Sequence, residues 1–335
     1  MKSNDIDVVI YWVDCDDKEW LSEYSKYKKK PPNRFRDLDI LKFIFRGIEK
    51  FMPWIRNVHF ITCGHTPSWL NIKNEKLKFH THKDIFYFQD ALPVFNSSAI
   101  EANFANIPNL SEKFILFNDD TLILKPISVE RFFIHDKPVD YISLSYKRKG
   151  FFYEYFKPQN ANACKFINNA YNYIDNKKTK NIKFSNRINK NYTLKTNLNN
   201  LLFSLFSDIM WFNIYHHPQA HLKSTWLTFS EKEKNTIIKE TSFSKFRSST
   251  DINQYLYRFI NLSSNNFYPK EYKDHLSVYV KNIKNLQKNI DNYLSYTFLC
   301  ICEDENMSNH DFNFLKKILN ENLTSIFPVK SNFEI

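Results

Sequence analysis

The chain has 335 residues and a formal net charge of +11, and it contains 32 Phe and 19 Tyr but only 3 Gly. An aromatic content of 17% supplies enough apolar surface for a large core, which excludes a disordered protein. So few glycines exclude a Walker loop and a GxGxxG loop, so that any bound phosphate must be held by side chains, a metal ion or helix N-termini. The positive charge favours an anionic partner, such as a nucleotide, a charged polymer or an anionic membrane face.

The five cysteines, at positions 15, 63, 164, 300 and 302, fit neither a disulfide framework nor a CxxC zinc motif. The simplest interpretation is a reducing compartment. Asp5 and Asp7 interrupt any signal-peptide pattern, and no apolar run approaches the roughly 20 residues of a membrane span. Residues 201–215 are the most apolar stretch and read as an amphipathic or core helix, which leaves surface association with a membrane open.

Short β-branched and aromatic runs predict strands at residues 7–13, 58–62, 77–80, 114–117 and 296–301. Helical patterns predict a helix from about Lys18, one that Asp37 caps and that ends before Pro53, one opened by a capping box at residues 98–101, one from Thr250 to about Asn261, and one at residues 311–322.

The alternation of strands and helices through residue 120 predicts an α/β fold, with a mostly parallel sheet and helices on both faces. We expect residues 1–144 to form the α/β core of the chain. Residues 145–195 are polar and show no clear period, so they read as an insertion or lid. Residues 196–335 would form a helical region whose final strand completes the active site.

Asn118, Asp119 and Asp120 carry the strongest chemical signal, because they follow a predicted buried strand. Ligands of open α/β sheets sit beyond the carboxyl ends of strands, and paired carboxylates there can hold Mg²⁺ or Mn²⁺ on a diphosphate. The acidic turn with Asp14 and Asp16 follows the first strand in the same way. Both segments would also suit ordinary turns.

Three basic clusters could act on phosphate or on a hydroxyl. Arg34 and Arg36 could clamp phosphate oxygens, or form a surface pair beside a helix cap. The segment from His216 to His221 could supply a general base, bind a metal or be structural. Arg247 could stabilise the charge of a transferring phosphate, although a lone arginine before a helix is ordinary.

In their order and in their amino-acid sequences, these segments resemble the Stealth family of capsular polysaccharide phosphotransferases, which includes the animal GlcNAc-1-phosphotransferase catalytic subunit. The matching segments are residues 7–17, 34–120, 216–218 with 246–251, and 300–304 with 327–334. Three departures stand inside them: Cys15 replaces the usual Gly, Ile40 the usual Glu, and Cys302-Glu303 the usual Asn-Asp.

The resemblance implies a GT-A-like α/β sheet with helical additions, in which the core at residues 1–144 binds a nucleotide sugar. It also implies transfer of a hexose-1-phosphate, with N-acetylhexosamine-1-phosphate as the leading choice, from a UDP-sugar to a hydroxyl of a capsular or cell-surface glycan, with release of UMP. The expected place is the cytoplasm, or a peripheral position at the inner face of the cell membrane with the capsule assembly machinery. No nucleic-acid partner is expected, since no recognised fold signature accompanies the basic residues.

The implied mechanism is an in-line attack of the acceptor hydroxyl on phosphorus. We expect Asp119 and Asp120 to hold Mg²⁺ or Mn²⁺, Arg36 and Arg247 to neutralise phosphate charge, Asp120 to act in catalysis and His216 to accept the proton. His216 is favoured over His217 because the family pattern is His-x-Pro. The expected substrate-binding residues are Asp14, Asp16, Arg34, Asn96, Asn118, His217, Asp251 and Lys330.

Two other functions fit the sequence. A metal-dependent glycosyltransferase would break the sugar–phosphate bond and release UDP instead of UMP. An inactive relative that binds polyanions would account for the charge of +11 and for the substitutions at Ile40 and Cys302.

Overall fold

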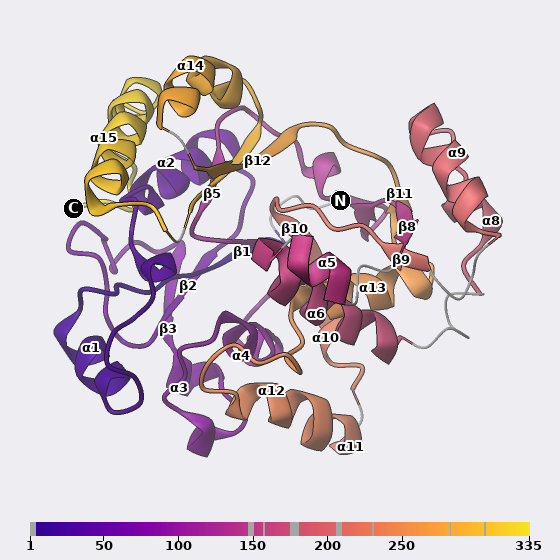
Figure 1. Cartoon of the computed structure of the whole chain (residues 1–335), viewed down its shortest axis with the longest axis horizontal. Coiled ribbons are helices and arrows are strands. Elements are labelled where there is room, and N and C mark those ends of the chain that lie inside the picture. Colours follow the sequence, from indigo (N-terminus) through magenta and orange to yellow (C-terminus); the bar gives the residue numbers. More distant parts are fainter. Residues whose placement is uncertain are drawn as a thin grey trace.

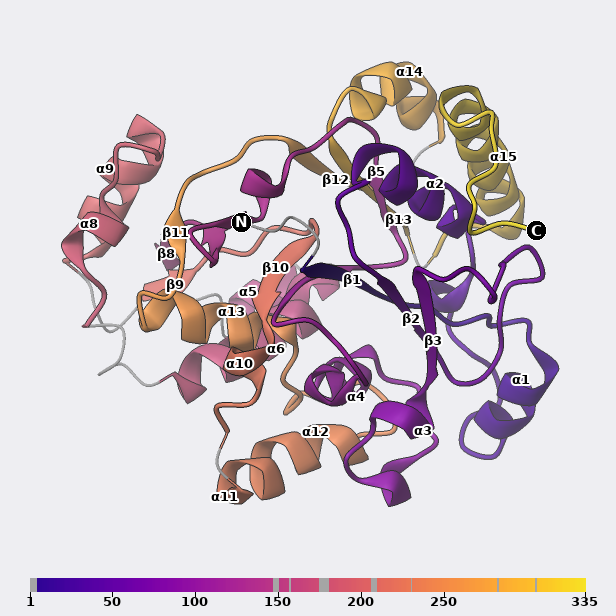
Figure 2. The ribbon, with the colours of Figure 1, turned by 180° about the vertical axis from the view of Figure 1, so that it is seen from behind.

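The computed structural model describes residues 5–146, 151–156, 158–174, 181–205, 210–229, 231–281, 283–304 and 306–335. At its centre lies a five-stranded sheet of order β10-β4-β1-β2-β3, which runs through the molecule in Figures 1 and 2. Its strands are β1 (Ile6–Tyr11), β2 (Val58–Thr62), β3 (Leu77–Thr81), β4 (Lys113–Phe117) and β10 (Gln219–Leu222). The first four are parallel, and β10 runs antiparallel to β4.

The described helices are α1 (Lys18–Ser25), α2 (Leu41–Phe51), α3 (His82–Ile85), α4 (Ser97–Glu101), α5 (Phe151–Phe156), α6 (Pro158–Tyr173), α8 (Phe184–Arg187), α9 (Leu194–Phe203), α10 (Lys223–Trp226), α11 (Glu231–Glu233), α12 (Lys239–Phe243), α13 (Gln254–Ser263), α14 (Ile283–Leu294) and α15 (Asn309–Ile326). Three smaller sheets have the strand orders β12-β13-β5, β11-β7-β6 and β8-β9. Their strands are β5 (Thr121–Ile123), β6 (Phe133–Ile134), β7 (Lys137–Asp140), β8 (Leu144–Tyr146), β9 (Met210–Phe212), β11 (Tyr268–Pro269), β12 (His275–Val280) and β13 (Phe298–Glu303).

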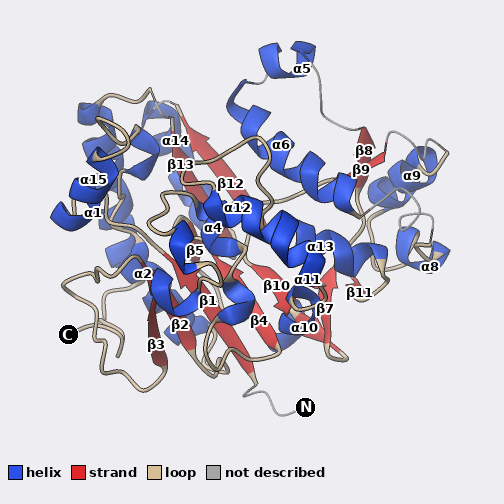
Figure 3. Cartoon of the chain, turned by 90° about the horizontal axis from the view of Figure 1, so that it is seen from below, coloured by secondary structure: helices blue, strands red, loops and turns tan. Residues whose placement is uncertain are grey.

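Both faces of the central sheet are buried, as the apolar strands predict. Successive side chains of a strand point to opposite faces, so Val8 and Ile115 enter one core while Val9 and Leu116 enter the other. The first core is covered by α2 and α15, and the second by α4, α6 and α13. Figure 3 shows helices on both sides of the strands. The prediction of a mostly parallel α/β sheet flanked by helices is confirmed.

Residues 145–195 contain α5, α6 and α8 in their described part. Ile167 and Ala170 of α6 are buried in the second core, against α13. The polar run therefore includes one helix of the main core. By contrast, α8 and α9 lie at the edge of the molecule opposite α15 (Figures 1 and 2).

Several predicted helix starts are wrong, for local reasons. Asp37 does not cap α2; its carboxylate accepts from the Asp39 backbone and from Nε1 of Trp12 instead. At α4, Asn96 is the N-cap. Glu101 closes no capping box there, because its carboxylate accepts hydrogen bonds from Tyr11 and from the Gln254 backbone.

Two further helix boundaries differ from the predictions. Asn253, not Thr250, caps α13. The apolar stretch at residues 201–215 is not one helix, because α9 ends at Phe203 and β9 occupies Met210–Phe212, while residues 206–209 lie outside the described chain.

A buried polar network ties the first three strands together. The Asp7 carboxylate is fully buried and accepts hydrogen bonds from Arg56 (Nε, 2.9 Å), the Ser111 backbone (2.7 Å) and Nε2 of His59 (3.1 Å). Nδ1 of His59 lies 2.9 Å from Nε2 of His80 on β3. The network links β1, β2 and β3 and leaves the negative charge of Asp7 compensated.

Helix α2 makes two close contacts with distant parts of the chain. Gly47 lies against β5, where an added Cβ would be 2.5 Å from the carbonyl oxygen of Ile123. Arg46 forms a two-armed ion pair with Glu334, at 2.7 and 2.6 Å, and also donates to the carbonyl of Phe327. The last residues of the chain are thereby fixed to α2.

None of the helices in the described ranges combines the length and the apolarity that crossing a bilayer requires.

Candidate active site

Three segments that are far apart in the sequence meet at the carboxyl end of β4. Asn118, Asp119 and Asp120 follow β4 directly. His216 precedes β10, which pairs antiparallel with β4, so that its side chain lies over the end of that strand. Cys300 pairs with Thr121 across β13 and β5, which brings β13 to the same place. The carboxyl edge of the sheet is where open α/β folds bind ligands.

The central contact joins Asp120 and His216. Nε2 of His216 lies 3.1 Å from Oδ1 and 3.2 Å from Oδ2 of Asp120, and Nδ2 of Asn118 is 3.3 Å from the same nitrogen. The two side chains keep 35% and 28% of their surface exposed, so a substrate can reach them. Burial opposes charge on both groups, but the opposite charge of the partner outweighs it: the pKa of His216 is raised and that of Asp120 is lowered.

Asp119 lies beside this pair with the opposite tendency. Burial, the charge of Asp120 and the charge of Asp37 together raise its pKa above the ordinary value. A group of carboxylates that repel one another in this way favours a bound cation. The oxygen donors of Asp119 and Asp120 therefore fit a hard divalent cation.

Two thiols complete the wall of the site. Sγ of Cys302 donates to Oδ2 of Asp120 at 3.2 Å, and Sγ of Cys300 lies 3.6 Å from Sγ of Cys302. Ser277 on β12 donates to the backbone carbonyl of His216 at 3.0 Å. The sheet of β12 and β13 thus holds both members of the central pair.

Tyr11 and Glu101 form a buried support behind the site. The Tyr11 hydroxyl at the end of β1 donates to Oε1 of Glu101 at 2.8 Å, and the Gln254 backbone donates to Oε2 at 2.8 Å. Burial raises the pKa of Glu101, whereas the charges of Arg247 and His216 lower it. Sequence reasoning missed these two residues as part of the site. The spacing of Ser98 and Glu101 predicts a helix cap, and no local pattern signals the hydrogen bond between Glu101 and Tyr11.

Arg247 is exposed and its backbone is fixed by packing. Its Nη2 donates to Oγ of Ser97 at 3.1 Å. The neighbouring Phe246 ring stacks on Phe95 with 5.5 Å between ring centroids. Arg247 is thus held beside the N-terminus of α4, where its guanidinium electrostatically affects Tyr11 and Glu101.

Comparison of the sequence with known proteins identifies the family of the chain. Residues 34–140 match the family model of Stealth protein conserved region 2. The chain is 34% identical to a capsular polysaccharide phosphotransferase WcwK of Streptococcus pneumoniae, over 99% of both chains. It is 33% identical to the exopolysaccharide phosphotransferase cps2G of Lactiplantibacillus plantarum, over 98% of this chain and 96% of that one.

The chain belongs to the Stealth family. Among solved structures, a galactosyltransferase LgtC covers 93% of this chain and 95% of its own, at 9% identity and a TM-score of 0.39.

Two residues that the Stealth resemblance suggested as substrate ligands are bound to each other. Nδ2 of Asn96 donates to Oδ2 of Asp251 at 2.8 Å, and the Ser248 backbone donates to the same oxygen at 2.8 Å. Both side chains are buried. Their visible role is to fix the loop that carries Arg247.

Of the two arginines near residue 35, Arg36 contacts the connection between β13 and α15. Nη1 of Arg36 donates to the carbonyl of Met307 at 3.1 Å, Nε lies 3.8 Å from Glu303, and the guanidinium covers the Phe312 ring at 4.2 Å. The guanidinium of Arg34 lies 5.2 Å from the ring centroid of Phe35. Glu303, one of the departures from the family pattern, is therefore the ionic neighbour of Arg36.

The acidic turn after β1 is held by a histidine that sequence reasoning missed. The Asp14 backbone donates to Nε2 of His65 at 2.9 Å, and Oδ1 of Asp14 accepts from the Asp16 backbone at 2.9 Å. Burial lowers the pKa of His65, which suits its role as a neutral acceptor. Asp17 is the N-cap of α1. The turn lies at the same edge of the sheet as Asp119, because β1 and β4 are parallel neighbours.

The side chains of His217 and Lys330 contact other parts of the chain than the His216–Asp120 pair. Nδ1 of His217 contacts the carbonyl of Pro218 at 2.8 Å, and its ring lies on His275 at 4.4 Å. Burial lowers the pKa of His217 well below the ordinary value, whereas the pKa of its neighbour His216 is raised. The exposed Lys330 ammonium donates to the carbonyl of Ile335 at 2.9 Å, within the C-terminal segment that α2 anchors.

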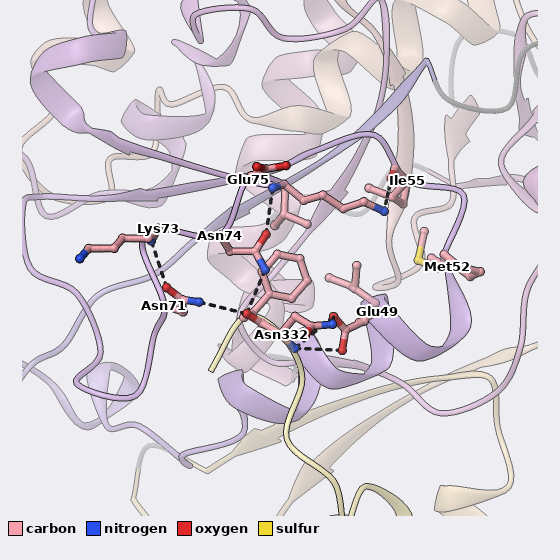
Figure 4. A pocket seen from close by; sticks show the side chains of 13 residues that line it. Glu49, Met52, Ile55, Asn71, Lys73, Asn74, Glu75 and Asn332 are labelled. Carbon is pink, nitrogen blue, oxygen red and sulfur yellow. Dashed lines mark hydrogen bonds between the residues drawn. The ribbon is translucent and has the colours of Figure 1, made fainter. Parts of the chain in front are cut away.

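A pocket of about 610 Å³ opens at the amino ends of β2 and β3, on the opposite edge of the sheet from Asp119 (Figure 4). Its polar wall is occupied by internal hydrogen bonds. The side chains of Asn71 and Asn74 both donate to the backbone carbonyl of Asn332, and the side-chain amide of Asn332 donates to Glu49. This pocket is thus part of the anchor of the C-terminal segment and lies at the opposite edge of the sheet from the candidate active site.

Proposed function

We propose that the protein transfers a hexose-1-phosphate, N-acetylhexosamine-1-phosphate in the leading case, from a UDP-sugar to a hydroxyl of a capsular or cell-surface glycan and releases UMP. Membership of the Stealth family makes the chain a sugar-phosphate transferase; the donor, the acceptor and the product are the proposal. The observation that carries it is the contact of His216 with Asp120 beside Asp119, at the carboxyl end of β4.

In this reaction, the acceptor hydroxyl attacks the phosphorus that bears the sugar, and the bond from that phosphorus to the nucleoside monophosphate breaks. His216 takes the hydroxyl proton, and the Asp120 carboxylate stabilises the imidazolium that forms. The buried hydrogen bond between Tyr11 and Glu101 supports this pair from behind. Positioning and charge neutralisation supply most of the rate in phosphoryl transfer, so a rigid site is what the reaction needs.

The exposed Arg247 neutralises charge on the transferring phosphate, and Arg36 contributes from the β13–α15 side. Asp14, Asp16, Arg34 and Asn118 would contact the nucleotide sugar. Asp119 and Asp120 would hold Mg²⁺, with Mn²⁺ as the alternative, and the bound cation would neutralise the diphosphate.

The nucleotide product decides between this reaction and ordinary glycosyl transfer. Purified protein would be incubated with Mg²⁺, a set of UDP-sugars and capsule-type oligosaccharides, and the released nucleotide would be separated by chromatography. We expect acceptor-dependent UMP and a phosphodiester in the glycan. Release of UDP would instead establish a glycosyltransferase, and absence of any nucleotide product would favour an inactive relative.

His216→Ala and Asp120→Asn are the catalytic controls for this assay. Each should lower the rate of UMP release by about 10²- to 10⁴-fold. His310→Ala is the matched control, because His310 is exposed at the start of α15 and should turn over like the unmodified protein. Near-full activity of the first two variants would reject the assigned roles.

Helix α9 supports a peripheral position on the inner face of the cell membrane. Its exposed leucines follow helical spacing along one face and are each more than half exposed: Leu194, Leu198, Leu201, Leu202 and, just beyond the helix, Leu205. Exposed Lys190 and Lys195 lie in the same region and would attract anionic lipid head groups. We propose that this face docks on an anionic lipid surface, close to the glycan under assembly.

Co-sedimentation with phosphatidylglycerol vesicles tests this docking. The double substitution of Leu198 and Leu202 by Ser should weaken vesicle binding at least about tenfold. Leu227→Ser, at a half-exposed leucine after α10, is the control and should bind normally. Equal binding of all three proteins, or equal binding to neutral phosphatidylcholine vesicles, would reject the docking face.

A further inference from the structure

The proposed phosphotransfer gives no role to the two thiols of the site. Cys300 and Cys302 are two residues apart on β13, so both side chains point to the same face of the strand. Their Sγ atoms are 3.6 Å apart, and Sγ of Cys302 is 3.2 Å from Oδ2 of Asp120. Thiols at this position give the site a chemistry that carboxylates alone lack.

The donor atoms already lie at metal-ligand spacing. One ligand atom from each of Asp120, His216 and Cys300 falls within 4.8 Å of the others, and Cys302 touches two of the three residues. Two thiolates on one tetrahedral zinc ion, each about 2.3 Å from the metal, are about 3.8 Å apart, close to the spacing of the two sulfur atoms.

The chemical type of the donor atoms indicates which metal ion this site binds. Mg²⁺ prefers oxygen ligands, whereas a set of sulfur, imidazole nitrogen and carboxylate oxygen binds Zn²⁺. Cys300 is buried and Cys302 is half-buried, so the sulfur side of the site is protected from water. The open side, at His216 and Asp120, gives an ion its way in.

We propose that Cys300, Cys302, His216 and Asp120 form a binding site for Zn²⁺, and that zinc bound there inhibits the transferase. Each thiol releases its proton to solvent as it binds the ion, and His216 binds through neutral Nε2. The inhibition rests on the proposed function, because zinc would occupy the two groups that phosphotransfer uses. The binding itself does not depend on that function.

Cobalt titration tests the binding without any turnover, because Co²⁺ replaces Zn²⁺ and its bonds to thiolate absorb light. Metal-free protein should take up one equivalent of Co²⁺ with a thiolate-to-cobalt absorption that added Zn²⁺ removes. Cys300→Ser and Cys302→Ser should each abolish this absorption and weaken Zn²⁺ binding at least about 10- to 100-fold. Cys63→Ser is the control: this thiol is exposed and lies 3.3 Å from His65, away from the site.

Circular dichroism checks that each variant is folded, and if Cys300→Ser is unstable, Cys302→Ser decides. The absence of thiolate absorption in the unmodified protein overturns the inference, and so does its loss only in Cys63→Ser.

Inhibition is a separate arm of the test. Micromolar Zn²⁺ should suppress UMP release with Mg²⁺ present, and Cys302→Ser should be suppressed at least about tenfold less, relative to its own zinc-free rate. Cobalt binding without any UMP release would remove the proposed function and keep the zinc site. UMP release without cobalt–thiolate absorption would do the reverse.

Discussion

The imidazole of His216 lies 3.1 Å from Oδ1 of Asp120, although 96 residues separate the two in the chain. The pair is brought together by β10, which lies antiparallel to β4. The Asp120 carboxylate favours the protonated imidazole and is the strongest of the groups that raise the pKa of His216; the charges of Glu101 and Asp119 add to its effect.

The protonation of His216 should depend on Asp120. The pKa of His216 should lie above 6.5 in the unmodified protein, so the proton-accepting form, and with it kcat/KM, should increase as pH rises through this pKa. In Asp120→Asn the strongest group that raises this pKa is removed while burial still lowers it, so the pKa of His216 should fall. Nuclear magnetic resonance titration of the histidine side chains measures both values. An unchanged pKa in the variant would show that Asp120 does not control His216.

Removal of Arg247 should slow catalysis more than it weakens donor binding. Arg247→Ala should lower kcat by about 10²- to 10³-fold, with a smaller change in KM, if its guanidinium acts on charge that develops in the transition state. Ser249→Ala, an exposed neighbour on the same loop, should behave like the unmodified protein. A change in KM alone would make Arg247 a binding residue.

Asp7 should stabilise the fold down to low pH. Its folded pKa of about 2 lies below the ordinary value of 3.8, so its contribution, about 2 kcal/mol, is fully present above pH 4 and is lost as pH falls through 2. Asp7→Asn should therefore lower the free energy of unfolding at pH 7 by about 2–4 kcal/mol. Urea denaturation at several pH values measures this. The exposed Asp5 provides the control, and an effect of Asp5→Asn as large as that of Asp7→Asn would refute a specific role of the buried network.

Buried neutral histidines should make the protein sensitive to mild acid. Burial lowers the pKa of His82 and His221 to about 3 and that of His80 to about 4. The unfolded chain binds these protons near pH 6.5, so stability should fall as pH decreases from 6.5 toward 4, by up to about 1.4 kcal/mol per pH unit for each group.

Thermal unfolding at pH 7, 6 and 5 measures this slope. His82→Leu should reduce it, whereas His310→Gln, at a side chain that is 91% exposed, should not. Equal slopes in all three proteins would mean that these histidines already take up protons in the folded protein.

Gly47→Ala should destabilise the protein, although alanine is the better helix former by about 1 kcal/mol. The new methyl group would lie 2.5 Å from the Ile123 carbonyl oxygen, and β5 cannot yield easily because it pairs with β13. We expect a loss of about 1–3 kcal/mol in chemical denaturation. Lys50→Ala, on the exposed end of the same helix, should change little; a gain in stability for Gly47→Ala would show that α2 and β5 can separate.

Local patterns predicted the strands of the central sheet well, because buried parallel strands are continuous apolar runs. The runs at 58–62 and 114–117 match β2 and β4 closely. The prediction therefore placed Asp119 and Asp120 correctly, directly after β4. Helix caps were less predictable, because an acidic side chain such as Asp37 or Glu101 can bind a distant partner instead of its own helix.

The supporting residues of the site could not be predicted for the same reason. His65 and Tyr11 act through contacts that only the folded sheet creates. The approach of Cys300 to Asp120 depends on the pairing of β13 with β5, which no local pattern encodes.

The order in which the sheet collects its strands has a consequence for synthesis in the cell. The carboxylates after β4 are made early, while β10, β13 and the Glu334 that clamps Arg46 are made late. A chain still emerging from the ribosome contains β1 to β4 before it contains His216, the residue to which the proposed reaction assigns the proton. Under the proposed function, a chain that stops short of β10 would therefore be catalytically silent, and turnover would begin only after most of the chain has been made.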